Sequence, residues 1–218
     1  MRKLSPEQLL KGGILCLKNA SNLIEEADLL FQNKKFNRAY FLYYTSGEEI
    51  AKGEDIMWYA HDINIGLSRN FFGLDESFRT HIRKSKTNFV TLTMFNTKNI
   101  QRMKKMSEIL VKVNSLKEAK IEIEKYLSKF KNNNLENRID KFYNKRMKMR
   151  NDCLYVNYKD KSSFFLKSIK KKQVLAMKKE VSYLLDTLKN SILVAKDKKW
   201  RKKGKEVQAF IKGNLENN

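Results

Sequence analysis

The chain has 218 residues and a net charge of +22, from 46 Lys and Arg against 24 Asp and Glu. Its length suits one domain with a substantial core, and one Pro with only eight Gly leaves too few breaks for a fold of many short strands, so we predict an all-α protein. Residues 1–75 hold 9 basic and 10 acidic side chains, so the positive excess lies in the last two thirds of the chain. This excess either suits binding to a polyanion such as nucleic acid or is only a solvated, Lys-rich surface.

Two long helices are predicted at the start of the chain. Ser5 suits the N-cap position and Pro6 the first helical position, and apolar residues at helical spacing extend this helix to about Gln32. The turn "NKKFN" leads to a second helix from about Phe36 to about His61, which is so rich in aromatic residues that much of it must be buried. The short connection predicts an antiparallel hairpin.

Three shorter helices are predicted in the middle of the chain. Residues 63–77 form a loop with two Gly, and Asp75 can cap a third helix whose apolar stripe includes Leu92. Apolar spacing predicts a fourth helix near residues 100–113, and a capping box predicts a fifth near residues 115–130.

Two more helices complete the predicted bundle. A sixth helix carries Ile139 and Met149 inward, and "NYKDKSS" after it is predicted as a loop. A long final helix repeats apolar residues from Val174 to Ala195.

The predicted domain organisation is one helical domain with a tail. Residues 1–195 are expected to form a bundle of about six to seven helices. Residues 196–218 are expected to form a basic helical tail around Trp200, which either docks on RNA or a membrane surface or is a solvated, frayed helix end.

Several kinds of site are absent from the sequence. It has no Gly-rich phosphate loop, no G-x-S-x-G, no H-E-x-x-H and only two His, so we expect no metal site and no cofactor. Cys16 and Cys153 lie far apart without a C-x-x-C pair, which predicts buried, reduced thiols. No stretch reaches the roughly 18 apolar residues of a membrane span, so a cytoplasmic protein is expected.

Three stretches remain that can carry chemistry: "RAYFLYYTSGEEIAKG" (38–53), "FRTHIRKSK" (78–86) and "RNDCLYVNY" (150–158). In this order they resemble the HEPN-domain abortive-infection proteins of the AbiV type, which are bacterial antiphage proteins, over most of residues 5–195. The resemblance implies an all-α HEPN bundle, commonly a homodimer. In such a bundle an Arg, a polar residue and a downstream His line a metal-independent ribonuclease site at the dimer cleft.

Residue by residue, Arg150 matches the motif Arg and Asn151 the polar position, whereas Tyr155 stands where these ribonucleases keep His. Metal-free RNA cleavage needs a base, an acid and a cation on the phosphoryl oxygens. Arg supplies the cation, but a Tyr with an ordinary pKa of about 10 is a poor base at neutral pH, although it can serve as an acid or a phosphate donor. If the His role is lost, the deficit is on the order of 10²–10⁴ in rate.

His81 can restore the missing proton carrier. It lies in a basic stretch whose other members are candidate phosphate ligands: Arg79, Arg83, Lys84 and Lys86. The alternative is that His81 is a partly exposed helix residue paired with a carboxylate. His61, near the end of the second helix, is given no catalytic role.

Helix geometry constrains the motif, because residues five apart point about 140° from one another. Either the helix unwinds at residues 151–152, or Arg150 and Tyr155 face a partner subunit across a two-fold axis. Tyr155 can also be an interfacial or core aromatic residue.

Glu48 and Glu49 fall inside the most apolar predicted helix, so at least one should point inward. Glu48 and Lys52 have the favourable i,i+4 order for an ion pair. A second buried glutamate would need a cation, since an unpaired buried charge is costly, and Arg150, Arg79 and Arg83 are the candidates. We expect Glu49 or Glu48 to support the site by orienting Arg150.

These observations give two functional hypotheses. The first is a homodimeric abortive-infection ribonuclease that acts on RNA or the translation machinery. The second is a non-catalytic interaction module that binds RNA, nucleotide or a phage-encoded activator protein.

Overall fold

The computed structural model of the protein describes residues 4–64, 80–94, 135–155, 157–159, 163–165 and 168–197, together with positions 105, 121, 122, 125, 199 and 202. Every structural statement below concerns these residues. The predicted loop at residues 63–77, the predicted helices near 100–113 and 115–130 and the basic tail lie almost entirely outside them.

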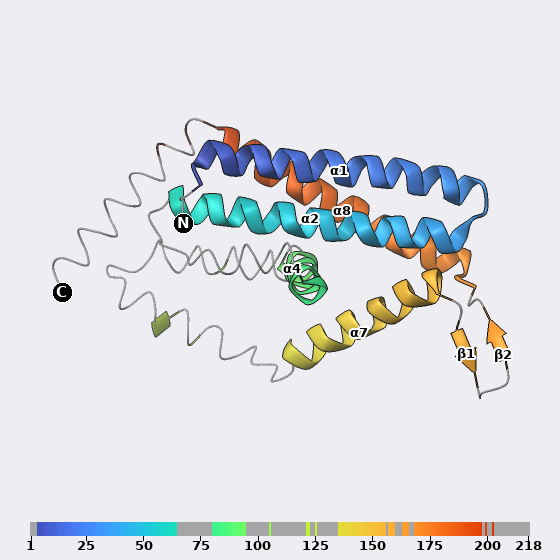
Figure 1. Cartoon of the computed structure of the whole chain (residues 1–218). Helices are drawn as coiled ribbons and strands as arrows, with labels where there is room; N and C mark the ends of the chain where they lie inside the picture. Colours follow the sequence, from blue (N-terminus) through green and yellow to red (C-terminus); the bar gives the residue numbers. More distant parts are fainter. Residues whose placement is uncertain are drawn as a thin grey trace.

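The first two helices form the predicted antiparallel hairpin (Figure 1). Helix α1 covers Pro6–Gln32, and its start is a capping box in which Ser5 Oγ accepts from the Gln8 N–H at 3.2 Å and Gln8 Oε1 accepts from the Ser5 N–H at 2.8 Å. Helix α2 covers Phe36–Asn64, three residues longer than predicted. Lys34, at the turn between them, has a positive φ of 59°.

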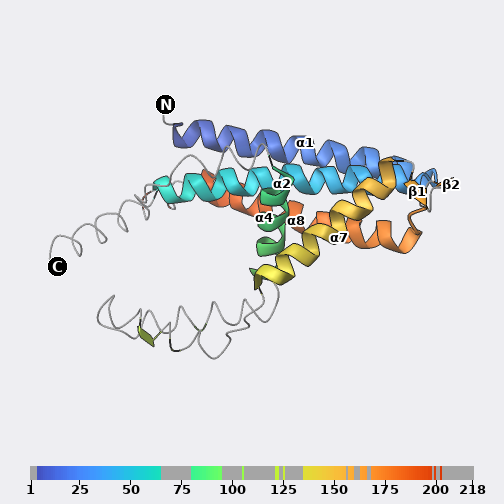
Figure 2. The same cartoon turned by 60° about the horizontal axis from the view of Figure 1, so that its bottom comes forward.

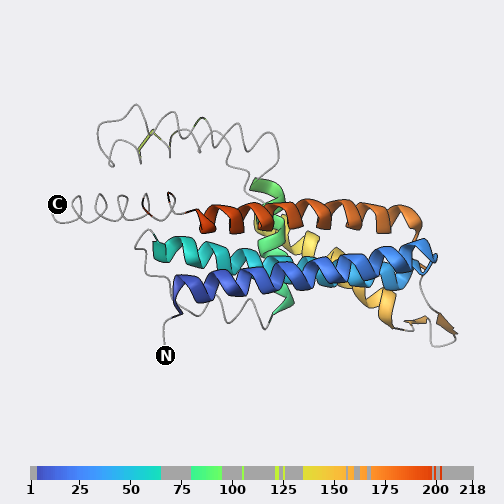
Figure 3. The ribbon, with the colours of Figure 1, turned by 90° about the horizontal axis from the view of Figure 1, so that it is seen from above.

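Helix α8 (Lys171–Lys196) packs along this hairpin and completes the core (Figure 3). Its predicted apolar stripe is confirmed, since these residues are buried: Val174, Met177, Val181, Leu184, Leu188, Ile192 and Ala195. The three helices pack closely at Gly53, where an added Cβ would lie 2.6 Å from Leu188 Cδ2 and 3.2 Å from Cys16 Cβ. A side chain at this position would separate the helices.

Two further helices cross the bundle, as Figure 2 shows. Helix α4 covers His81–Met94 and begins later than a helix capped by Asp75 would. Thr80, immediately before it, is non-helical, and its hydroxyl accepts a hydrogen bond from the Arg83 N–H at 3.3 Å. Helix α7 covers Leu135–Leu154, and its C-terminal end lies beside the start of α2 (Figure 1).

A short hairpin follows α7, where the sequence predicted a loop. Strand β1 (Asn157–Lys159) pairs antiparallel with β2 (Ser163–Phe165), with Tyr158 opposite Phe164. Strands of three residues are too short to show an alternating pattern, so the sequence did not distinguish them from a loop. The all-α prediction is otherwise confirmed, because every other regular element in the described residues is a helix.

Both cysteines are buried and unpaired, as predicted. Burial raises the pKa of Cys16 to about 11 and that of Cys153 to about 12, so both thiols stay protonated at neutral pH. Within the described ranges, no helix is both long enough and apolar enough to cross a membrane.

Candidate functional site

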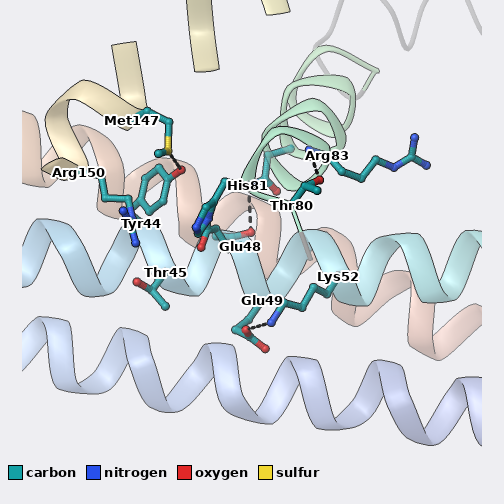
Figure 4. Close-up of polar contacts among 12 residues, drawn as sticks. Tyr44, Thr45, Glu48, Glu49, Lys52, Thr80, His81, Arg83, Met147 and Arg150 are labelled. Atoms are coloured by element: carbon teal, nitrogen blue, oxygen red, sulfur yellow. Dashed lines mark hydrogen bonds and ion pairs between the residues drawn. The ribbon is translucent and has the colours of Figure 1, made fainter. Parts of the chain in front are cut away.

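One face of α2 collects residues from all three stretches singled out in the sequence (Figure 4). Tyr44 and Glu48 are one helical turn apart on this face. The guanidinium of Arg150, from α7, lies 5.9 Å from the centre of the Tyr44 ring, and His81, from the start of α4, contacts Glu48. The fold therefore brings Arg150 of α7 and His81 of α4 against neighbouring positions on the same face of α2, Tyr44 and Glu48.

Arg150 is half-buried and is held by aromatic rings. Its guanidinium also lies 5.6 Å from the centre of the Phe41 ring, and Nη1 donates to Asn151 Oδ1 at 3.3 Å. Its Nε is buried without a hydrogen-bond partner among the described residues. Because ring faces attract a cation without neutralising it, Arg150 keeps a positive charge that can bind an anion.

His81 donates from Nδ1 to Glu48 Oε1, since an ionised carboxylate can only accept. Its side chain is 39% exposed, whereas that of Glu48 is 10% exposed, so the pair has a buried end and an accessible one. This confirms the prediction that His81 is a partly exposed residue paired with a carboxylate. The same contact leaves Nε2 as the nitrogen that can exchange a proton with a ligand.

Glu49 points to a different side of α2, toward α1 (Figure 4), and pairs with Lys52 three residues later. The predicted pairing of Glu48 with Lys52 is therefore wrong, because the two glutamates lie about 100° apart and Glu48 faces α4 instead. Neither glutamate forms the expected ion pair with Arg150. Phe41 and Tyr44 support Arg150 in their place, and both were present in the quoted aromatic stretch.

The two described basic residues of α4, Arg83 and Lys84, differ in exposure, since the Arg83 side chain is 36% exposed and Lys84 is buried. Arg83 Nε lies 3.5 Å from Asp55 Oδ2, and Thr87 donates to Asp55 Oδ1 at 2.9 Å. Lys84 is only 6% exposed. Arg79 and the side chain of Lys86 lie outside the described residues. Arg83 thus forms part of the contact between α4 and α2, and the burial of Lys84 makes it a poor phosphate ligand.

The two other motif residues lie at the exposed end of α7. Asn151 is exposed, and Tyr155 is 57% exposed immediately after the last helical residue. The Tyr155 N–H donates to Asn151 O at 3.0 Å, so the helix does not unwind at residues 151–152 and that alternative is wrong. A regular helix turns Tyr155 about 140° away from Arg150 within one chain.

Sequence reasoning missed an ion pair one turn before Arg150. Arg146 pairs with Glu180 of α8, and its guanidinium lies 4.0 Å from the centre of the Phe142 ring. Burial raises the pKa of Glu180, while Arg146 lowers it. A groove of about 300 Å³ lies beside this pair, between α7 and α8. The i,i+4 spacing places Arg146 and Arg150 on one face of α7, but no local sequence signal links Arg146 to Glu180, which lies 34 residues later.

A second missed residue is Glu54, which is 1% exposed. Ser191 donates to its Oε2 at 3.2 Å, and its Oε1 has no hydrogen-bond partner in the described part of the chain. Burial raises the pKa of Glu54 from 4.5 to about 7, and the neighbouring Asp55 adds to the rise against the lowering effect of Ser191. Among the described side chains, no group of three His, Cys, Asp or Glu is placed to bind a metal ion.

Comparison with known proteins identifies the family. The HEPN_AbiV model, described as AbiV, matches residues 8–179, which is well over half of the chain. No curated protein and no solved structure matches the chain. The matched range contains all three stretches and both Arg150 and His81. The chain is therefore an abortive-infection HEPN-domain protein of the AbiV family.

Proposed function

We propose that this protein is a metal-independent endoribonuclease that acts on RNA, free or within the translation machinery. The observation that carries the proposal is that Arg150 and His81 contact residues one turn apart on α2, at Tyr44 and Glu48. A phosphate cation and a proton carrier side by side are what cleavage of RNA by its own 2′-hydroxyl requires.

His81 supplies the proton transfer that Tyr155 performs poorly. With Nδ1 held by Glu48, Nε2 takes the proton from the 2′-hydroxyl as this oxygen attacks the phosphorus. The bond from phosphorus to the 5′-oxygen breaks, and that oxygen receives a proton from a general acid. The products are a 2′,3′-cyclic phosphate and a free 5′-hydroxyl. Glu48 acts as a positioning residue, since it fixes the tautomer and the direction of the ring.

Arg150 binds the phosphoryl oxygens on which negative charge develops. Its planar fork suits a phosphate, and stacking on Phe41 and Tyr44 limits the conformations of its side chain. A carboxylate partner would compete with phosphate for the same donors. Support by aromatic rings leaves the guanidinium without a carboxylate partner among the described residues, and only Nη1 donates to another described side chain, that of Asn151.

We further propose that the working site is formed at a homodimer cleft, since HEPN domains commonly dimerise. Asn151 and Tyr155 are exposed at the end of α7, where a partner subunit can complete the site. Tyr155 of one subunit then donates a proton or a hydrogen bond near Arg150 of the other. A monomeric mass by light scattering at micromolar concentration would remove this part of the proposal.

The test is incubation of the purified protein with total RNA in EDTA, followed by analysis of the cut ends. We expect cyclic phosphate ends from the wild type, and a loss on the order of 10²–10⁴ in rate for His81→Ala. Arg150→Ala should also lose cleavage. His61→Ala is the matched control, because His61 is an exposed histidine near the end of α2 that is given no catalytic role, and this variant should cleave RNA normally. RNA left intact by the wild type, even with phage extract added, would exclude catalysis.

Glu48→Gln tests the positioning role, with Glu49→Gln as its control on a different face. Glu48→Gln should reduce the rate and alter its pH dependence, because the amide cannot stabilise the protonated ring as a carboxylate does. Glu49→Gln should leave both unchanged.

A second candidate function is a non-catalytic module that binds RNA, nucleotide or a phage-encoded activator protein. The exposure of Tyr155, in the position that the motif reserves for His, favours this alternative. It predicts that the wild type binds RNA or the activator without cutting RNA. Under this alternative Arg150→Ala weakens binding, and His81→Ala has no effect.

A further inference from the structure

A second positively charged surface in the described residues lies at the turn between α1 and α2, just before the α2 face described above. A pocket of about 270 Å³ opens there, lined by Lys34, Lys35, Phe36, Asn37, Arg38 and Ser168. We call it the turn pocket. We propose that the turn pocket binds backbone phosphates of the RNA substrate next to the Arg150 site. This inference rests on the proposed function for the identity of its ligand.

The positive charges of the turn pocket are not neutralised by any described acidic residue. Lys34, Lys35 and Arg38 are exposed, and none forms an ion pair with a described carboxylate. Asp28, the nearest acidic residue before the turn, is already engaged by Tyr43 and by Lys178 Nζ at 2.6 Å. Unpaired cations around a concave surface attract an anion more strongly than cations dispersed over a convex one.

The start of α8 adds further charge of the same sign. Lys170, Lys171 and Lys172 are exposed there, and the Ile169 N–H donates to Asn37 Oδ1 at 2.9 Å, which ties this segment to the turn pocket. The sequence contains no acidic residue between Asp28 and Glu48, or between Asp160 and Glu180. Both segments that meet at this end of the bundle are therefore purely basic.

About one helical turn of α2 separates Arg38 of the turn pocket from Phe41 of the candidate site. Arg38 lies three residues before Phe41, so the two side chains are neighbours on the helix surface. Phe41 is one of the rings against which Arg150 stacks. In Figure 1 the end of α7 also lies beside the starts of α2 and α8. A strand bound at Arg150 can therefore continue past Phe41 to Arg38 and the turn.

These features suit a phosphodiester backbone better than a single small anion. The basic residues extend over two helix starts and a turn, so they match a row of phosphates, and Lys contacts of this kind carry affinity without reading sequence. The turn pocket would thus position RNA for cleavage at many sequences.

The test is binding of the full-length protein to a fluorescent 2′-O-methyl RNA oligonucleotide, which lacks the attacking hydroxyl, by anisotropy at several salt concentrations. The pocket variant combines Lys34→Asn, Lys35→Gln and Arg38→Gln. Asn is chosen at position 34 because it tolerates the positive φ. The matched control, Lys11→Gln with Lys18→Gln and Lys189→Gln, removes three exposed charges on α1 and α8.

We expect the pocket variant to lose affinity for RNA, and the loss to grow by on the order of tenfold as the salt concentration falls from about 200 mM to about 50 mM. The slope of log affinity against log salt should fall in magnitude by about 2, since each lost phosphate contact on a single strand contributes about 0.7. The control should keep the wild-type slope. Equal losses in both variants would mean non-specific attraction and would overturn the proposal. The proposal would also be overturned if the pocket variant bound RNA normally but no longer floated with anionic vesicles, because this result would assign the pocket to lipid headgroups.

The outcome is separable from that of the proposed function. If the protein cuts RNA but the pocket variant binds and cuts normally, the turn pocket fails and the ribonuclease proposal survives. If the wild type binds RNA without cutting it and the pocket variant loses binding, the turn pocket survives and catalysis fails. If both the ribonuclease proposal and the turn-pocket proposal hold, the pocket variant should cleave RNA with a raised KM and an unchanged kcat.

Discussion

Replacement of Glu54 by Gln should change how the stability of the protein depends on pH. Glu54 is almost completely buried between α2 and α8, and its pKa is raised from 4.5 to about 7, chiefly by burial. Gln has nearly the same shape, and its amide oxygen can still accept from Ser191. The substitution therefore removes the titration with little change in packing.

The sign and size of the effect follow from the two pKa values. Below pH 4.5 Glu54 is protonated in both states, so its contribution to stability is fully present. As pH rises from 4.5 to about 7, the unfolded chain ionises this group and the folded protein does not, so stability falls. Each unit of difference between the two pKa values is worth about 1.36 kcal/mol, so wild type should lose about 3 kcal/mol through Glu54 across this window.

The assay is urea unfolding of wild type and Glu54→Gln, followed by circular dichroism from pH 4.5 to pH 8. The difference in unfolding free energy should move by about 3 kcal/mol in favour of the variant over this range. Glu180 also has a raised pKa, but it is present in both proteins and cancels in the difference. A difference that stays constant with pH would refute the claim that Glu54 is protonated in the folded protein at low pH and ionises only near neutrality.

Three further predictions test the packing and the site. Gly53→Ala should destabilise the protein by about 1–3 kcal/mol in thermal or urea unfolding, because the new Cβ clashes with α8, whereas Gly12→Ala, with its nearest neighbour at 3.5 Å, should be neutral or stabilising by up to about 1 kcal/mol. Arg146→Ala should cost about 3–5 kcal/mol by leaving Glu180 unpaired, and adding Glu180→Gln should recover part of it in the same assay. Arg150→Lys should reduce RNA cleavage by on the order of tenfold or more, because Lys lacks the planar fork; cleavage at the wild-type rate would contradict the role given to the guanidinium.

The long helices were predictable because their signals are local. The cap at Ser5 and the apolar stripe of α8 depend on residues within a few positions of one another, and both predictions are confirmed. The start of α4 was misplaced because Asp75 and Thr80 are both acceptable caps by residue type, and only the structure shows that Thr80 precedes the helix. The β1–β2 hairpin was missed because its strands are too short to carry a pattern.

The support of Arg150 shows where local reasoning stopped being sufficient. Spacing alone allowed Glu48 or Glu49 to orient this residue. The structure assigns Glu48 to His81, Glu49 to Lys52, and Arg150 to the rings of Phe41 and Tyr44, which come from a different helix. Such choices depend on which face of α2 each neighbouring helix covers.

The sequence by itself determined the helical class, the strong positive charge and the three stretches that mark the AbiV family, because composition, periodicity and motif order are properties of the chain. The tertiary structure decided that His81 meets Glu48, that Lys84 is buried and that Lys34 and Arg38 share a pocket with Ser168. Each of these features depends on how separate elements or their connecting segments pack together. The spacing of residues along the sequence allows several such arrangements equally, and helix crossing and side-chain packing select one of them.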